Sequence, residues 1–231
     1  MGAAIVRGDG YAAHSIWDHS ETVAKLYRAR ARDEAEEMTC AAQAAELLQP
    51  LAAEGDSLLD AGCGSGYFFH SLRRRGMRLA YWGIDASPRL IQIGREELAR
   101  FGVPAERLHA IRIEDFDGEA DHVLCMNVLS NIDNYHRPLE RLLKAARKSL
   151  VLRESAKEGA RYTYVRDPYL DPGVELSVHV NAYDTAELMS FIERHGFTVE
   201  RIVDRRAGDK PEDVIGHPHW WTFFRAVRKS K

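Results

Sequence analysis

The stretch Leu58–Gly66, which reads LLDAGCGSG, constrains the fold of this chain more than any other feature. An apolar run ends at an aspartate and is followed by three glycines at alternate positions. Such a pattern permits a tight turn whose backbone can approach a ligand closely. Dinucleotide-binding loops have the spacing G-x-G-x-x-G, whereas here the spacing is G-x-G-x-G and Tyr67 takes the place of the third glycine. The loop therefore predicts a nucleotide-like ligand and disfavours an NAD-dependent oxidoreductase.

From Asp56 onward the sequence alternates between short apolar strands and helix-forming segments. This alternation predicts an α/β fold with a mostly parallel sheet, helices on both faces and right-handed crossovers. The predicted strands are 57–61, 78–84, 108–113, 121–126, 149–153, 197–204 and 219–227, and the predicted helices are 65–75, 87–100, 137–148 and 185–195.

Two segments fall outside this alternation. Residues 1–54 indicate an N-terminal helical cap ahead of a domain at 55–231, with Ser20 as a predicted N-cap and a helix in the Ala-rich run 35–48. Residues 154–183, after the fifth strand, contain several tyrosines and two Asp-Pro pairs. We interpret this segment as an insertion that caps a substrate.

Acidic residues end the next two predicted strands. Asp85 follows the second strand, where its carboxylate could accept hydrogen bonds from both hydroxyls of a ribose. At the end of the third strand, Glu114 or Asp115 could accept from an adenine amino group, and the sequence does not choose between them; Phe116 could stack or offer its backbone N–H. Because the Asp60 carboxylate could meet an ammonium group, the pattern predicts a nucleoside that carries an amino-acid tail.

These motifs resemble those of the class I S-adenosylmethionine-dependent methyltransferases, particularly the small-molecule branch with LDxGCGxG, GID and a DxVLC-type fourth strand. The resemblance covers Asp56 to Arg153. It implies a Rossmann-like seven-stranded sheet whose last strand is inserted antiparallel between its neighbours, and S-adenosylmethionine as the cofactor. The N-terminal helices and the insertion match no specific subfamily. The cofactor-binding residues that the resemblance implies are Asp60, Gly62, Cys63, Gly64, Gly66, Asp85, Glu114, Asp115, Phe116 and Asn127.

The end of the fourth predicted strand bears on the methyl acceptor. It reads Cys125-Met126-Asn127-Val128, without the Asn/Asp-Pro-Pro-aromatic run of the family's N-methylating nucleic-acid branch. Cys125 lies in an apolar strand, which favours a buried thiol over a nucleophile. With a net charge of −3, this favours a small-molecule acceptor methylated at oxygen or nitrogen, and no nucleic-acid partner. A nucleic-acid or protein methyltransferase, or a catalytically inactive cofactor-binding regulatory protein of the same fold, remain alternatives.

Three segments are candidates to cover the substrate at the carboxyl edge of the sheet: the N-terminal stretch, the insertion, and the loop before the last strand. Their candidate substrate-binding residues are Tyr11, His14, Trp17, Tyr169, His179 and His217. His219 is the candidate catalytic residue, because a neutral histidine can take a proton from an oxygen or nitrogen acceptor near pH 7. Two histidines in a His-Pro-His run do not define a metal site, so none is predicted.

The cysteines Cys40, Cys63 and Cys125 are isolated in the sequence, which favours a reducing compartment. No run approaches the roughly 18 apolar residues that a membrane-spanning helix needs. We therefore expect a cytoplasmic protein without a membrane partner. The sequence leaves the oligomeric state open, a homodimer included.

Overall fold

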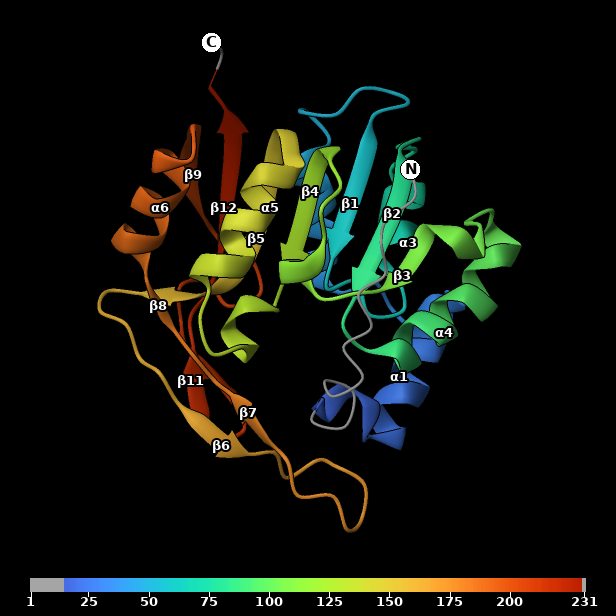
Figure 1. Ribbon diagram of the computed structural model, residues 1–231, viewed down its shortest axis with the longest axis vertical. Helices are drawn as coiled ribbons and strands as arrows, with labels where there is room; N and C mark the ends of the chain where they lie inside the picture. The colour runs from blue at the N-terminus through green and yellow to red at the C-terminus, as the bar shows by residue number, and fades with distance from the viewer. Residues whose placement is uncertain (1–14, 230–231) are drawn as a thin grey trace.

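The computed structural model describes residues 15–229, and its centre is a mostly parallel sheet (Figure 1). Within these residues seven strands follow the order β3-β2-β1-β4-β5-β12-β9, and the short strand β8 pairs with the end of β5. Pairing is parallel from β3 to β5, whereas β12 is antiparallel to both β5 and β9. The strands are β1 Ser57–Ala61, β2 Ala80–Asp85, β3 Leu108–Ala110, β4 Ala120–Met126, β5 Ala146–Lys157, β8 Tyr183–Asp184, β9 Phe197–Val203 and β12 Trp221–Arg228.

Helices cover both faces of this sheet, which confirms the predicted Rossmann-like fold class. The described α-helices are α1 Glu21–Ala31, α2 Thr39–Leu48, α3 Phe68–Arg74, α4 Pro88–Leu98, α5 His136–Ala145 and α6 Thr185–Arg194. No helix among the described residues is long and apolar enough to cross a membrane. The division into a cap at 1–54 and a domain at 55–231 stays a prediction.

The two faces of the sheet carry separate apolar clusters, because successive strand residues point to opposite sides. In β4, Val123 and Cys125 belong to a cluster with residues of α5 and α6, while Leu124 between them belongs to a cluster with residues of α2, α3 and α4. Cys125 is fully buried, as its place in an apolar strand predicted. The core therefore lies on both sides of the strands, and their ends remain available for polar residues.

Two helices begin directly after a serine whose side chain caps the first turn. The hydroxyl of Ser20 accepts from the backbone N–H of Val23 at the start of α1, which confirms the predicted N-cap. Ser87 caps α4 in the same way and Pro88 takes the first helical position. The Ala-rich helix, by contrast, begins at Thr39 and not at residue 35.

Strand β5 is longer than the sequence pattern predicted. The prediction of a helix over 137–148 and a strand over 149–153 was wrong at both borders, since α5 ends at Ala145 and β5 runs from Ala146 to Lys157. The reason is tertiary, because β5 lies between β4 and β12 and pairs along much of its length with both. Glu154 is therefore a buried sheet residue and not the first residue of an insertion.

Two small hairpins stand outside the main sheet. Strands β6 Tyr164–Arg166 and β7 Ser177–His179 pair within the predicted insertion. Strands β10 Glu212–Val214 and β11 His217–His219 pair where a loop was predicted, through a turn in which Ile215 and Gly216 both have positive φ. The last sheet strand consequently begins at Trp221, and the prediction that it includes His219 was wrong.

Candidate functional site

The glycine loop lies at the carboxyl end of β1, at the edge of the sheet toward which β1, β2 and β4 run (Figure 1). Its backbone is tied to the neighbouring strand, because the N–H groups of Gly62 and Cys63 donate to the carbonyl of Ile84 at 2.8 and 3.0 Å. Gly64 has a φ of +57°, and a Cβ there would lie 2.2 Å from the Cε1 atom of Tyr27. Glycine is therefore required at this position both by the turn and by the aromatic ring that lies over it.

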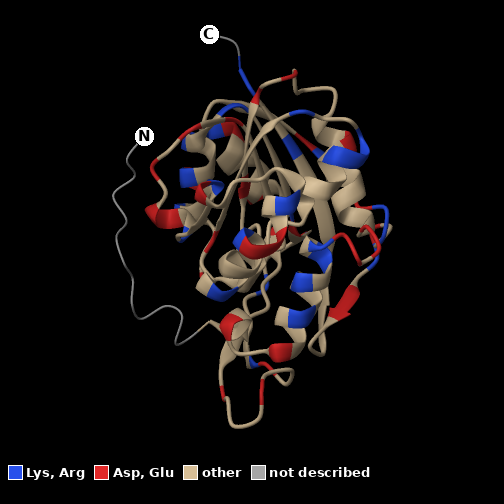
Figure 2. Ribbon diagram, turned by 90° about the vertical axis from the view of Figure 1, so that its right-hand side faces the viewer, with Lys and Arg blue, Asp and Glu red and all other residues tan. Residues whose placement is uncertain are grey.

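Helix α1 brings Tyr27 to this loop and is held beside α4. The hydroxyl of Ser65 donates to the backbone carbonyl of Tyr27 at 2.8 Å. Arg28 forms ion pairs with the α4 residues Glu96 and Glu97. Figure 2 shows acidic and basic residues interspersed on this side of the molecule and not segregated by sign. The N-terminal helix is thus part of the surroundings of the loop.

Asp85 joins the end of β2 to the glycine loop. Its Oδ2 accepts from the Gly64 N–H at 2.7 Å, and its Oδ1 accepts from the Ser87 N–H at 2.8 Å. Burial raises the pKa of Asp85 to about 6, against the two backbone hydrogen bonds, which lower it. The carboxylate is therefore largely ionised at neutral pH, and it sits at the strand end where the sequence placed a ribose acceptor.

Asp60 is almost fully enclosed, with 4% of its surface exposed. The hydroxyl of Tyr81 donates to its Oδ2 at 2.7 Å, a contact that the sequence did not indicate. Burial raises the pKa of Asp60 to about 7, and the charge of Asp85 contributes in the same direction. A cation placed next to Asp60 would favour its ionised form.

Replacing Asp60 by asparagine should raise the free energy of unfolding at neutral and alkaline pH by up to about 4 kcal/mol. The folded pKa of about 7 lies above the ordinary value of 3.8. As pH rises between them, the unfolded chain releases a proton that the folded chain retains, so the wild-type fold loses stability. Asparagine does not titrate and still accepts from Tyr81. Urea unfolding should show a gain that grows between about pH 4 and 7 and is then constant; a gain independent of pH would contradict this.

The predicted adenine-binding residues lie on a short 3-10 turn, Ile113–Asp115, after β3. Glu114 and Asp115 are both half-buried, and the Nε atom of Arg112 lies 3.6 and 3.5 Å from their carboxylates. The choice between the two acids therefore stays open. The backbone N–H of Phe116 donates to the Ile113 carbonyl at 3.2 Å. That N–H is thus engaged within the turn, and the ring of Phe116 packs against the apolar cluster that includes Ile113. A role of either group in binding a base stays a prediction.

Asn127 follows β4 with a positive φ of 61°. Its side-chain oxygen accepts from a guanidinium nitrogen of Arg153, and its backbone N–H donates to the Arg153 carbonyl at 2.8 Å. Arg153 is buried and also donates to Asp204 at 2.7 Å. The guanidinium carbon lies 4.5 Å from the ring centre of Trp221. Asn127 is therefore held by Arg153, whose guanidinium is in turn held by residues from a distant part of the chain.

Glu154 is a site residue that the sequence reasoning missed. Its side chain is fully buried at the carboxyl end of β5. Four donors surround its carboxylate: the N–H groups of Val128, Leu129 and Ser130 at 2.9 Å each, and the Ser130 hydroxyl at 2.7 Å. Burial raises its pKa, while these hydrogen bonds lower it. Glu154 thus shapes the loop that follows β4, directly after Asn127.

The three predicted caps meet in one small apolar cluster. Ile16 and Trp17 from the N-terminal stretch pack with Val178 and Val180 of the insertion and with Ile215 of the β10–β11 turn. Backbone contacts add to this, since the Asp171 N–H donates to the His19 carbonyl at 3.0 Å. The sequence named the three segments but gave no indication that they contact one another.

Two of the predicted substrate-binding residues, Tyr11 and His14, lie outside the described residues, whereas Tyr169 and His179 lie within them. The Tyr169 side chain is 71% exposed, and His179 contacts the ring of Tyr164. Within residues 15–229 no hydrogen bond or ring contact joins Tyr169 or His179 to the strand-end acids.

The β10–β11 hairpin brings His217 and His219 to the carboxyl edge, as the antiparallel last strand requires. Trp220, directly after His219, donates its backbone N–H to the Ser155 hydroxyl at 3.1 Å, and its carbonyl accepts from Ala156 at 2.9 Å. The ring of His219 lies 4.7 Å from that of Trp221. His219 and Asn127 are thus connected through Trp221 and Arg153.

Comparison with known proteins shows the family and the fold of the chain. A family model described as a methyltransferase domain matches residues 9–202, which is most of the chain. The ubiquinone biosynthesis O-methyltransferase of Methylocella silvestris is 37% identical over 86 residues. That match spans 36% of this chain and only 32% of the relative's own length.

Solved structures share the fold over nearly the whole chain. The magnesium protoporphyrin IX methyltransferase of Synechocystis, solved with bound S-adenosylmethionine, has a TM-score of 0.62 at 16% identity and covers 99% of this chain and 100% of its own. A Burkholderia thailandensis 1,6-didemethyltoxoflavin-N1-methyltransferase has a TM-score of 0.60 at 18% identity, covering 100% and 94%. The chain therefore belongs to the methyltransferase-domain family and has the fold of the class I S-adenosylmethionine-dependent methyltransferases.

Proposed function

We propose that this protein transfers a methyl group from S-adenosylmethionine to an oxygen or nitrogen atom of a small molecule. The observation that carries the proposal is the position of Asp85, whose carboxylate links the glycine loop to the start of α4 at the carboxyl edge of the sheet. Ligands bind at this edge in open α/β sheets. The family match and the small-molecule substrates named for the similar proteins support the same activity.

The donor set around the loop fits the chemistry of that cofactor. Asp85 would hold the ribose hydroxyls, and Asp60 would meet the ammonium group. Asp18 lies close enough to raise the pKa of Asp85, and its buried Oδ2 has no hydrogen-bond partner among the described residues. An unpaired buried oxygen beside a carboxylate is suited to accept from a polyhydroxylated ligand. When bound, the cofactor supplies a methyl group on a sulfonium.

The residues of the chain would act mainly through orientation and exclusion of water. Methyl transfer requires the acceptor atom to lie in line with the bond that breaks, so positioning supplies much of the rate. The apolar cluster that joins the three caps would hold them over the sheet edge. His219 would accept the acceptor's proton at a ring nitrogen. Burial lowers its pKa to about 4, so the imidazole is neutral at pH 7, able to accept a proton but weakly basic.

Replacing His219 by alanine should reduce kcat by about a hundredfold while changing the dissociation constant of S-adenosylhomocysteine by less than about twofold. The reason is that His219 is separated from the cofactor loop by Trp221 and Arg153. The matched control is His136→Gln, an exposed histidine at the start of α5, which should leave both quantities unchanged. An unaltered kcat in the His219 variant would remove this residue from the proposed catalytic set.

Calorimetric titration with S-adenosylhomocysteine, S-adenosylmethionine and NAD tests the cofactor assignment. We expect saturable binding of the first two and none of NAD. Binding of NAD alone would favour an oxidoreductase. Binding of S-adenosylmethionine without methyl transfer to any metabolite would favour the catalytically inactive alternative.

A further inference from the structure

His219 is buried, with an exposed fraction of 1%. Within residues 15–229 neither ring nitrogen makes a hydrogen bond of good geometry, although a backbone contact with His217 acts to raise its pKa. A buried polar atom without a partner destabilises the fold, because it has lost its hydrogen bonds to water without replacing them. The two nitrogens of one imidazole therefore represent a considerable cost in the absence of a ligand. Such a cost is expected at a site built for a polar group that comes from outside the chain.

Arg161 stands next to this histidine and is also incompletely paired. One of its terminal nitrogens donates to the carbonyl of Pro218, the residue before His219, at 2.6 Å. Its Nε atom is buried and has no partner among the described residues. The guanidinium carbon lies 5.5 Å from the ring centre of Trp220. Arg161 is therefore held in place by a carbonyl and an aromatic ring, with one donor still free.

No carboxylate within residues 15–229 forms an ion pair with Arg161. Arg153, the other guanidinium near His219, differs in this respect because its charge is balanced by buried Asp204. Burial is the main cause that lowers the pKa of His219, and the backbone contact with His217 opposes it. The charges of Arg161, His217 and Arg153 lower the pKa further. Within residues 15–229, the surroundings of His219 thus include a positive charge on Arg161 that no ion pair compensates, and a negatively charged group would balance it.

The position of this charge is on the acceptor side of the site. Trp220 binds Ser155 and Ala156 at the carboxyl end of β5, and Trp221 lies between His219 and Arg153, which holds Asn127. Arg161 itself belongs to the segment between β5 and β6, which was predicted to cap the substrate. A group bound between Arg161 and His219 would therefore lie near the end of β4 and away from Asp85 on β2.

We propose that Arg161 and His219 form a subsite for an oxygen anion of the methyl acceptor, either a carboxylate or an ionised phenol. The proposal rests on the proposed methyl transfer and specifies the class of its substrate as acidic small molecules. The Nε–H of Arg161 and one N–H of His219 donate to the oxygen anion. These charge-assisted hydrogen bonds pair donors that are otherwise buried and unpaired.

Binding of matched acid and neutral probes to the protein saturated with S-adenosylhomocysteine tests this subsite. The probes are benzoate against benzamide for the carboxylate, and 4-nitrophenol above its pKa against nitrobenzene for the phenolate. Ligand-detected NMR titration should show that the wild-type protein prefers one anion over its neutral partner by at least about tenfold. The pair that shows the preference identifies the source of the anion.

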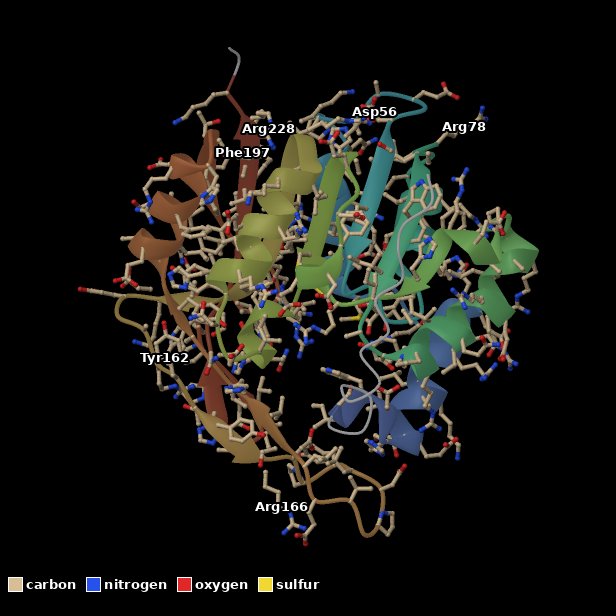
Figure 3. The ribbon with its side chains drawn as sticks, viewed as in Figure 1. Asp56, Arg78, Tyr162, Arg166, Phe197 and Arg228 are labelled. Carbon is tan, nitrogen blue, oxygen red and sulfur yellow. The ribbon has the colours of Figure 1, made fainter. Side chains whose placement is uncertain are left out.

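The variant Arg161→Gln should abolish this preference, and Arg161→Lys should restore part of it because the charge is kept while the planar fork is lost. The matched control is Arg166→Gln, an exposed arginine of the same insertion that pairs with Glu175 (Figure 3). The anion preference of Arg166→Gln should equal that of the wild type. The Arg161→Lys variant also keeps the test valid if Arg161→Gln fails to fold.

The outcome distinguishes this inference from the proposed function. If the wild-type protein does not bind S-adenosylhomocysteine, the proposed function fails. If it binds the cofactor product but shows no preference for either anion at millimolar concentration, or if Arg161→Gln retains the preference, the subsite is wrong while the methyltransferase assignment stands.

Discussion

Replacing Asp85 by alanine should weaken binding of S-adenosylhomocysteine by at least about a hundredfold. Two hydrogen bonds from ribose hydroxyls to a carboxylate contribute about 1.5–3 kcal/mol each, which corresponds to two or more orders of magnitude in affinity. The substitution also frees the Gly64 and Ser87 N–H groups, so the glycine loop loses its tie to the end of β2. Both effects act on cofactor binding in the same direction. Isothermal titration calorimetry measures the change.

The wild-type affinity should also depend on pH in a defined direction. Because burial raises the pKa of Asp85 to about 6 and that of Asp60 to about 7, both carboxylates become protonated as pH falls through these values, and the affinity should decrease below about pH 7. The Asp85→Asn variant should keep only the part of this dependence that comes from Asp60. Asp117→Ala, which removes an exposed acid after the same 3-10 turn that carries Glu114, is the control and should bind normally. An unchanged dissociation constant in Asp85→Ala would contradict the ribose assignment.

Replacing Glu154 by leucine should reduce the free energy of unfolding by about 4 kcal/mol or more. The substitution leaves four buried donors without an acceptor, and each unpaired donor costs about 1–3 kcal/mol. Because a domain of this kind is stable by only about 5–15 kcal/mol, the variant should be at the limit of folding. Glu154→Gln keeps one acceptor oxygen and should lose about 1–3 kcal/mol. Urea unfolding followed by circular dichroism measures both.

The loss of stability in the Glu154 variants should be accompanied by a change in cofactor binding. The loop held by Glu154 follows Asn127 directly, so Glu154→Gln should also weaken cofactor binding, by a smaller factor than Asp85→Ala. Glu158→Gln, an exposed glutamate just beyond β5, is the matched control and should stay within about 0.5 kcal/mol of the wild type. A Glu154→Gln protein as stable as this control would show that the four hydrogen bonds contribute little to the fold.

Much of the fold could be predicted because it depends on local patterns. The alternation of strands and helices gave the sheet, and the glycine spacing gave the loop after β1. The position of Asp85 beside the glycine loop could be predicted because the residue ends a strand, while its role in binding ribose stays a prediction. In each of these cases the informative residues are neighbours in the sequence.

The remaining features depend on contacts between distant segments. Glu154 accepts from residues about 25 positions earlier, and its burial follows from the length of β5, which the partner strands determine. The pair of Arg153 and Asp204 spans 51 positions. Arg161 contacts Pro218 and Trp220, the neighbours of His219, only because the β10–β11 hairpin returns to the carboxyl edge. The turn at Gly216 was a local signal for this hairpin that the sequence reading could have used.

The most direct test of the central claim is to incubate the protein with S-adenosylmethionine carrying a deuterated methyl group and a fractionated metabolite extract, and to follow small molecules by mass spectrometry. We predict a product that carries the deuterated methyl group, formed by the wild-type protein and absent with Asp85→Ala. If no labelled product forms in any fraction although the protein binds S-adenosylmethionine, the assignment of this chain as an active methyltransferase is contradicted.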